Sequence, residues 1–188
     1  SLDHRARLVR DTVRAIRGRV GRSFTVGVRL SPEDWGRARG LDRGRPGVGK
    51  RRGDPFAIHG FSSDGRHDVQ YLKFKDFDQA YDEKPKARLA GMSGQLSTRM
   101  GAAMRHAGHY LRQQKSSKKL MIVITDGEPA DVDVRDPQYL RYDAKKAVEE
   151  LSRSGIITYC MSLDPRADQY VSRIFGARNY MVVDHVER

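Results

Sequence analysis

The residues best placed for chemistry follow a continuous apolar run, Leu120–Thr125 (LMIVIT). A run of this kind predicts a strand that is buried on both faces of a parallel sheet. Asp126 is the first acidic residue after the run, so we expect its carboxylate at the carboxyl edge of the sheet, where ligands of such folds bind. Joined by hydroxyls from a neighbouring loop, this carboxylate would form a hard-oxygen site suited to Mg²⁺. The alternative is that Asp126 only caps the turn.

The residues after Asp126 extend this candidate site. Gly127 is expected to let the backbone turn sharply at the end of the strand. The acidic residues Glu128, Asp131 and Asp133 follow it. The loop at the edge of the sheet is therefore expected to be acidic.

The histidines and the single cysteine form no comparable pattern. His106 and His109 are three residues apart on an expected helix, which would suit a metal, but no Cys or Glu–His pattern accompanies them. We therefore expect these two histidines, together with His59 and His67, to be surface or packing residues. Cys160 is expected to be a small buried hydrophobic side chain. One cysteine excludes a disulfide framework and a zinc site built from several thiolates.

Sequence motifs of common enzyme classes are absent. The chain has no Gly-rich phosphate loop, no Gly-x-Ser-x-Gly elbow and no His–Glu metalloprotease helix. As a nucleophile or phosphate-transfer residue, Asp126 would lack the companions that such chemistry needs. The sequence therefore favours a binding module over an enzyme.

Two strands and a helix are expected before the apolar run. Phe56–Phe61 and Val69–Phe74 read as strands, and the turn-rich segment Ser62–Asp68 between them is typical of a hairpin. Thr98–Gln114 places its apolar residues on one face of a helix.

Two segments after the run repeat one pattern of helix start and stop signals. Asp136 and Asp164 are each followed by a proline, and Gly155 and Gly176 close the two expected helices. The strands expected after these helices are Ile156–Met161 and Tyr180–Val183. The alternation of strands and helices predicts an α/β fold with a doubly wound, mostly parallel, Rossmann-like sheet flanked by helices.

Positive charge is concentrated in the first 53 residues. The 188-residue chain has 36 Lys+Arg and 24 Asp+Glu, a formal net charge of +12. Residues 1–53 hold 14 Arg and one Lys against five acids, whereas residues 54–188 are nearly balanced. Such a segment is one feature of a basic nucleic-acid-binding protein, but its only aromatic rings are Phe24 and Trp35. We therefore separate an atypical Arg/Gly-rich segment, 1–53, from a domain, 54–188.

Hydropathy predicts a cytoplasmic domain with its own core. Hydrophobic residues make up 38% of the chain, which excludes a fully disordered protein. No apolar run approaches the ~20 residues that span a bilayer. No signal-peptide h-region follows the N-terminus.

Three segments together resemble a von Willebrand factor A (VWA) domain. They are Leu120–Asp131 (LMIVITDGEPAD), Ser97–Ala103 (STRMGAA) and Phe56–Ser63 (FAIHGFSS). The similarity runs from about Asp54 to Arg188, and its nearest branch is the C-terminal VWA domain of the NorD/CbbO family. The resemblance implies a protein-binding adaptor for a MoxR-type AAA+ ATPase. Its target enzyme would be rubisco or nitric oxide reductase.

The resemblance also implies a metal-ion-dependent adhesion site for Mg²⁺. In the family this site combines an Asp-x-Ser-x-Ser motif after the first strand, a Thr from a second loop and an Asp from a third. Thr98 and Asp126 match the last two. Ser97, Gly127 and Glu128 would shape the rim around them, and a carboxylate of the partner would complete the metal's ligand shell.

The Asp-x-Ser-x-Ser motif itself is missing. The best candidate for the first strand is Ser23–Leu30, where Arg29 would stand in place of the first Asp and only Ser31 would match a ligand position. Because a guanidinium repels Mg²⁺, we expect an incomplete site that is weak or empty. Three explanations of residues 1–53 remain open. The segment is a degenerate, metal-independent part of a VWA scaffold, an unrelated and disordered extension, or a sequence translated out of frame. The abrupt change at Asp54 favours the last.

Overall fold

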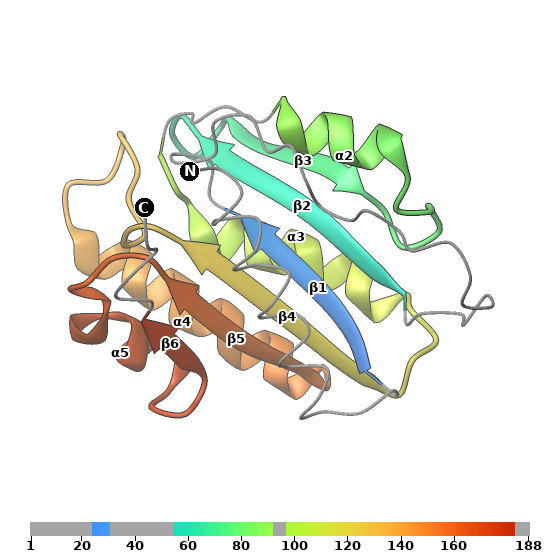
Figure 1. The fold of residues 1–188 in the computed structure, drawn as a ribbon. Helices are drawn as coiled ribbons and strands as arrows, with labels where there is room; N and C mark the ends of the chain where they lie inside the picture. Colours follow the sequence, from blue (N-terminus) through green and yellow to red (C-terminus); the bar gives the residue numbers. More distant parts are fainter. Residues whose placement is uncertain (1–23, 31–54, 92–96, 183–188) are drawn as a thin grey trace.

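The computed structural model describes residues 24–30, by their backbone alone, together with residues 55–91 and 97–182. In these residues six strands form one sheet in the order β3-β2-β1-β4-β5-β6 (Figure 1). The strands are β1 (Phe24–Leu30), β2 (Phe56–Ser63), β3 (Val69–Lys75), β4 (Lys118–Thr125), β5 (Ile156–Ser162) and β6 (Tyr180–Val182). Neighbouring strands are parallel except for the antiparallel hairpin of β2 and β3. The expected α/β fold with a mostly parallel sheet is confirmed.

Helices cover one face of this sheet. Those described are α2 (Glu83–Ala90), α3 (Met100–Arg112), α4 (Pro137–Arg153), the 3₁₀ helix η1 (Ala167–Gln169) and α5 (Val171–Phe175). In Figure 1, α3 and α4 run behind the strands. Met104 of α3, Leu151 of α4 and Phe175 of α5 share one buried core with Val123 of β4. Helix α2 contacts β3 at the end of the sheet.

Strand β4 is buried on both faces, as its apolar run predicts. Every residue from Leu120 to Thr125 is buried, and β4 lies inside the sheet, paired with β1 along one edge and with β5 along the other. Cys160, in the neighbouring β5, is also buried, and burial raises the pKa of its thiol to about 12. The thiol is therefore a small hydrophobic group, as expected, and not a reactive one.

The first strand, β1, which corresponds to the expected strand Ser23–Leu30, lies in the middle of the sheet. β1 pairs with β2 and with β4, and its last residue, Leu30, is opposite Gly60 and Ile124. The sheet is therefore continuous across the composition boundary at residues 53 and 54. The other residues of the Arg/Gly-rich segment, including Ser31, lie outside the described residues.

The helix signals of the carboxyl-terminal half are confirmed for α4. The Asp136 carboxylate caps it by accepting a hydrogen bond from the Gln138 backbone N–H at 2.9 Å, and Pro137 is its first residue. Gly155 follows the helix with a φ of 74°, a conformation that glycine adopts at little cost.

The second expected helix, between Asp164 and Gly176, is wrong as a continuous helix. It is divided at Tyr170 into η1 and the five-residue α5. The Tyr170 backbone has a φ of −126°, outside the helical range. Its ring is buried, and its hydroxyl donates to the Asp164 carboxylate at 3.2 Å. The break between η1 and α5 thus coincides with the burial of the Tyr170 ring and its hydrogen bond to Asp164.

One further helix boundary differs from expectation, and one helix was not expected. Helix α3 begins at Met100 and not at Thr98, because Thr98 is held in an extended bridge to Ala130. Helix α2 was not predicted. Its signal was the cap Asp82, whose carboxylate accepts from the Lys84 N–H at 3.0 Å. Among the α2 side chains that the structure describes, those of residues 83–89, only Pro85 and Leu89 are buried, so the apolar periodicity of the helix is weak.

Candidate functional site

Three segments that are far apart in the sequence meet at the carboxyl edge of the sheet, which we call the crest. Ser63, at the end of β2, exchanges two backbone hydrogen bonds with Ser97, at 2.8 and 2.9 Å. The Thr98 N–H then donates to the Ala130 carbonyl at 2.9 Å. The backbone thus joins the segment 97–98 to the end of β2 on one side and to the loop after β4 on the other.

This arrangement brings Thr98 to the loop that Asp126 opens. The Thr98 hydroxyl donates to the Glu128 carbonyl at 3.2 Å, and both Thr98 and Asp126 are partly exposed. In the ranges 55–91 and 97–182, no hydrogen bond or ion pair engages the Asp126 carboxylate. Since the Thr98 hydroxyl uses its proton on a carbonyl, the lone pairs of its oxygen are available to a cation.

A buried hydroxyl holds the turn after β4. The Thr125 side chain, 1% exposed, donates to the Gly127 carbonyl at 2.7 Å and lies 3.3 Å from the Gly127 nitrogen. The backbone bends at Gly127, but it does so without a conformation that requires glycine. Its φ is not positive, and a Cβ there would meet nothing within 4 Å. The turn is therefore fixed by Thr125, and Gly127 contributes an open surface to the rim.

A buried ion pair fixes the far end of the same loop. Arg99 Nε donates to Asp131 Oδ2 at 2.8 Å, and the two side chains are only 9% and 0% exposed. Asp131 Oδ1 accepts from the backbone N–H groups of Gly65 and Val132, each at 2.8 Å. Burial alone would raise the pKa of Asp131, but these donors together with Ser63 and Arg99 hold it below its usual value. The carboxylate therefore stays charged inside the protein.

Asp133 adds a second anchor to this cluster. It forms ion pairs with Arg99 and with Arg66, whose Nε lies 3.1 Å from Asp133 Oδ2. The Arg66 backbone N–H also donates to Asp133, at 2.9 Å, which lowers the pKa of that carboxyl. The preceding residue, Gly65, has a φ of 80°, so this turn requires glycine to aim both N–H groups at the two aspartates.

Arginines therefore neutralise most of a loop that looks acidic in the sequence. Glu128 is paired with Arg141 of α4, whose Nε donates at 2.8 Å, while Asp131 and Asp133 are paired as described. Asp126 remains as the loop's carboxylate without an ion pair in the described part of the chain. Sequence reasoning missed these arginines. Arg99 follows Thr98 directly, but its partner Asp131 lies 32 positions further on, and no local spacing signals such a pair.

Three of the described histidines, His59, His106 and His109, pack with aromatic rings. His59 is buried, and its Nδ1 forms a hydrogen bond with the Tyr71 hydroxyl at 2.6 Å. Its ring meets those of Tyr71 and Tyr110 edge-on. His67, His106 and His109 are exposed. No group of three or more His, Cys, Asp or Glu side chains that could hold a metal ion occurs in the residues described.

Within the described ranges, no helix combines the length and the apolar character needed to cross a bilayer.

Comparison with known proteins agrees with this architecture. The family model for the von Willebrand factor type A domain matches residues 41–186. Protein NorD of Stutzerimonas stutzeri is 37% identical over 131 residues, which are 70% of this chain and 21% of that protein. Protein NorD of Brucella abortus is 34% identical over 136 residues, 72% of this chain and 22% of that protein. The chain thus spans about a fifth of the length of these relatives.

Solved structures share the fold at lower identity. The manganese-loaded TRAP protein of Plasmodium vivax superposes with a TM-score of 0.59 and 14% identity, covering 87% of this chain and 69% of that one. The PilB minor pilin of Streptococcus sanguinis gives a TM-score of 0.59 at 12% identity, covering 87% and 57%. By its family model and its NorD relatives, this chain belongs to the von Willebrand factor type A domain family.

Proposed function

We propose that this chain is a protein-binding adaptor through which a MoxR-type AAA+ ATPase engages a target enzyme. Membership of the VWA family and similarity to proteins named NorD support an interaction module. Of the two targets implied by the resemblance, rubisco and nitric oxide reductase, the NorD relatives favour nitric oxide reductase. The module itself carries out no catalytic step.

The observation that carries the proposal is the charge of the crest. Glu128, Asp131 and Asp133 are occupied by arginines, whereas the Asp126 carboxylate is exposed to solvent in part and has no described counter-charge. A carboxylate held on a scaffold of hydrogen bonds and ion pairs costs little reorganisation when it binds. We therefore assign partner binding to Asp126 and Thr98, with Ser97, Gly127 and Glu128 as the rim.

The side chains present suit a hard divalent cation. Asp126 and Thr98 would hold Mg²⁺ through a carboxylate oxygen and a hydroxyl oxygen, the ligand types that this ion prefers. When bound, Mg²⁺ would supply the positive charge that takes up a partner's carboxylate. Without the Asp-x-Ser-x-Ser motif the site stays incomplete, so we expect weak metal binding. Direct contacts between the rim and the partner should then supply more of the binding free energy.

The proposal is tested by measuring the affinity of this chain for a purified MoxR-type ATPase by biolayer interferometry. Asp126→Ala should weaken binding about tenfold or more, as the loss of a central charged contact does. Asp78→Ala is the matched control, because Asp78 is an exposed aspartate beyond β3, whose carboxyl end lies at the opposite edge of the sheet. Its affinity should stay within about twofold of the wild type. Equal binding by the wild type and the Asp126→Ala variant would refute the role of the crest.

A further inference from the structure

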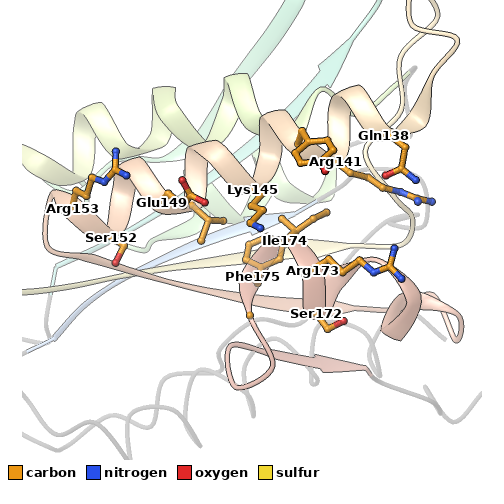
Figure 2. Close-up of a pocket in the computed structure, with 13 residues that line it drawn as sticks. Gln138, Arg141, Lys145, Glu149, Ser152, Arg153, Ser172, Arg173, Ile174 and Phe175 are labelled. Carbon is orange, nitrogen blue, oxygen red and sulfur yellow. The ribbon is translucent and has the colours of Figure 1, made fainter.

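Helices α4 and α5 enclose a groove that the crest does not use. Its volume is about 770 Å³. Ile174 and Phe175 of α5 form an apolar floor, and both are almost completely buried, at 3% and 2% exposure. Figure 2 shows Lys145 directed from α4 toward this floor, between the two helices. The lining thus combines an apolar floor with charged walls.

The charged walls are mainly positive. The lining contains four bases, Arg141, Lys145, Arg153 and Arg173, and one acid, Glu149. Figure 2 shows Arg141 and Arg173 at one end of the groove and Arg153 at the other. Cations are therefore spread over the whole length of the groove.

The remaining acids of α4 are turned toward α3. Arg105 of α3 forms ion pairs with Asp143 and Glu150, both at 2.7 Å. The hydrogen bond from Arg105 lowers the pKa of Glu150, so this carboxylate stays charged and committed to α3. Neither acid lines the groove. Two of the three acids of α4 thus face α3, while Arg141, Lys145 and Arg153 of the same helix line the groove together with Glu149.

The cations of the groove are left largely without counter-charges. In the part of the chain that the structure describes, Lys145, Arg153 and Arg173 form no ion pair. Arg141 is held by Glu128 at the crest. Glu149 is engaged by Lys146 at 3.4 Å. An apolar floor with unmatched cations on its walls complements a ligand that carries both carboxylates and an apolar side chain.

We propose that this groove docks an acidic segment of the partner protein. From Gln138 to Arg153 the α4 wall is roughly 22 Å long, because a helix rises ~1.5 Å per residue. An extended segment of about seven residues spans that length. Its carboxylates would pair with Lys145, Arg153 and Arg173, and one apolar side chain would rest on Ile174 and Phe175.

The groove and the crest meet at Arg141. This residue lines the groove and pairs with Glu128 of the rim, so a partner bound at the crest could continue into the groove. The inference rests on the proposed function in that the occupant is a protein. It uses a different surface, however, and can fail separately.

The probe is a fluorescein-labelled peptide of about eight residues, made of Glu and Asp with one central Leu, titrated with the 188-residue chain and followed by anisotropy. We expect saturable binding that weakens as salt is raised, because exposed ion pairs are screened. A peptide with Lys in place of the acids should not bind. Failure of the acidic peptide to bind would overturn the proposal.

Charge reversal tests the groove directly. The double variant Lys145→Glu/Arg173→Glu should weaken peptide binding about tenfold or more. The matched control Lys115→Glu changes an exposed lysine that lies outside the groove, and it should keep the wild-type affinity. Circular dichroism melting of each variant verifies that the fold is retained. Undiminished binding by the folded double variant would overturn the proposal.

Two further measurements separate this inference from its alternatives. Asp126→Ala should leave peptide binding unchanged, so failure of the crest and failure of the groove are distinguishable. A fluorescein-labelled oligothymidine of similar length should bind more weakly than the acidic peptide, because Tyr142 is the one exposed ring among the lining residues and offers a single stacking partner. Tighter oligothymidine binding that is lost in the double variant would assign the groove to nucleic acid instead.

Discussion

The crest and the groove between α4 and α5 treat their charges in opposite ways. At the crest, a loop with several acids is matched by arginines from three other segments, and Asp126 is left without an ion pair among the described residues. In the groove, Lys145, Arg153 and Arg173 form no ion pair with any residue that the structure describes. Each region therefore offers a partner only the charges that pairing leaves unmatched, a negative one at the crest and positive ones in the groove. The formal charge of a segment says little about the charge it offers to a partner.

The two regions also differ in how they are built. Buried hydrogen bonds and an ion pair between side chains far apart in the sequence hold the crest. The groove is made by one face of a capped helix and a short helix anchored by apolar burial. Substitutions that remove the internal charges of the crest should thus lower the stability of the fold. Substitutions on its open surface should leave the stability unchanged.

The largest expected effect is on stability and comes from Arg99→Ala. This change leaves the Asp131 carboxylate buried without its cation, and breaking such a buried pair costs about 3 kcal/mol or more. Urea denaturation measures it as a lower free energy of unfolding. Arg66→Ala is the matched control, because Arg66 is largely exposed and should cost at most ~1 kcal/mol. Equal losses in the two variants would show that the crest is not held by a buried pair.

The next effect is a dependence of stability on pH. The pKa of Asp131 is held below its ordinary value in the folded protein, so the unfolded chain binds a proton more readily than the folded one. The free energy of unfolding should therefore have its full contribution from Asp131 above the ordinary carboxyl pKa of about 4. It should lose that contribution as pH falls further. Asp131→Asn should flatten this acid limb in urea titrations at several pH values, and an unchanged limb would contradict the assignment.

A smaller effect is expected for metal binding. Because the Asp-x-Ser-x-Ser motif is absent, titration calorimetry should detect no Mg²⁺ binding tighter than roughly 1 mM. Clear binding that disappears in Asp126→Ala would mean that residues of the segment 1–53 complete the site. The contrast between the crest and the groove would then be smaller, because a bound cation would give the crest positive charge as well.

The smallest effect is expected for Gly127→Ala. The added methyl group would meet no atom within 4 Å, and the backbone has no positive φ at this position. The free energy of unfolding should stay within about 0.5 kcal/mol of the wild type. A matched contrast is Gly65→Ala, where the φ of 80° should cost roughly 1 kcal/mol or more. A large loss in Gly127→Ala would show that glycine, and not Thr125, fixes the turn.

Much of the fold could be predicted because its signals are local. The apolar run of β4, the cap Asp136 and the closing Gly155 each act within a few residues of the element they start or end, so sequence spacing reveals them. The division of the last helix at Tyr170 was not predictable in this way. It depends on where the tyrosine ring is buried and on a hydrogen bond to Asp164, and both require the packed structure.

The candidate site likewise has features that the sequence predicts and features that depend on the packed structure. By itself, the sequence determined which residues could bind a cation or partner, because residue types and strand ends are written in it: Asp126 follows the central strand, and Thr98 matches a family motif. Only the tertiary structure decided which charges remain available. Ion pairs such as Arg99–Asp131 and Glu128–Arg141 join residues that are distant in the chain. Electrostatic pairing depends on distance in space and on burial, and neither is set by spacing along the chain.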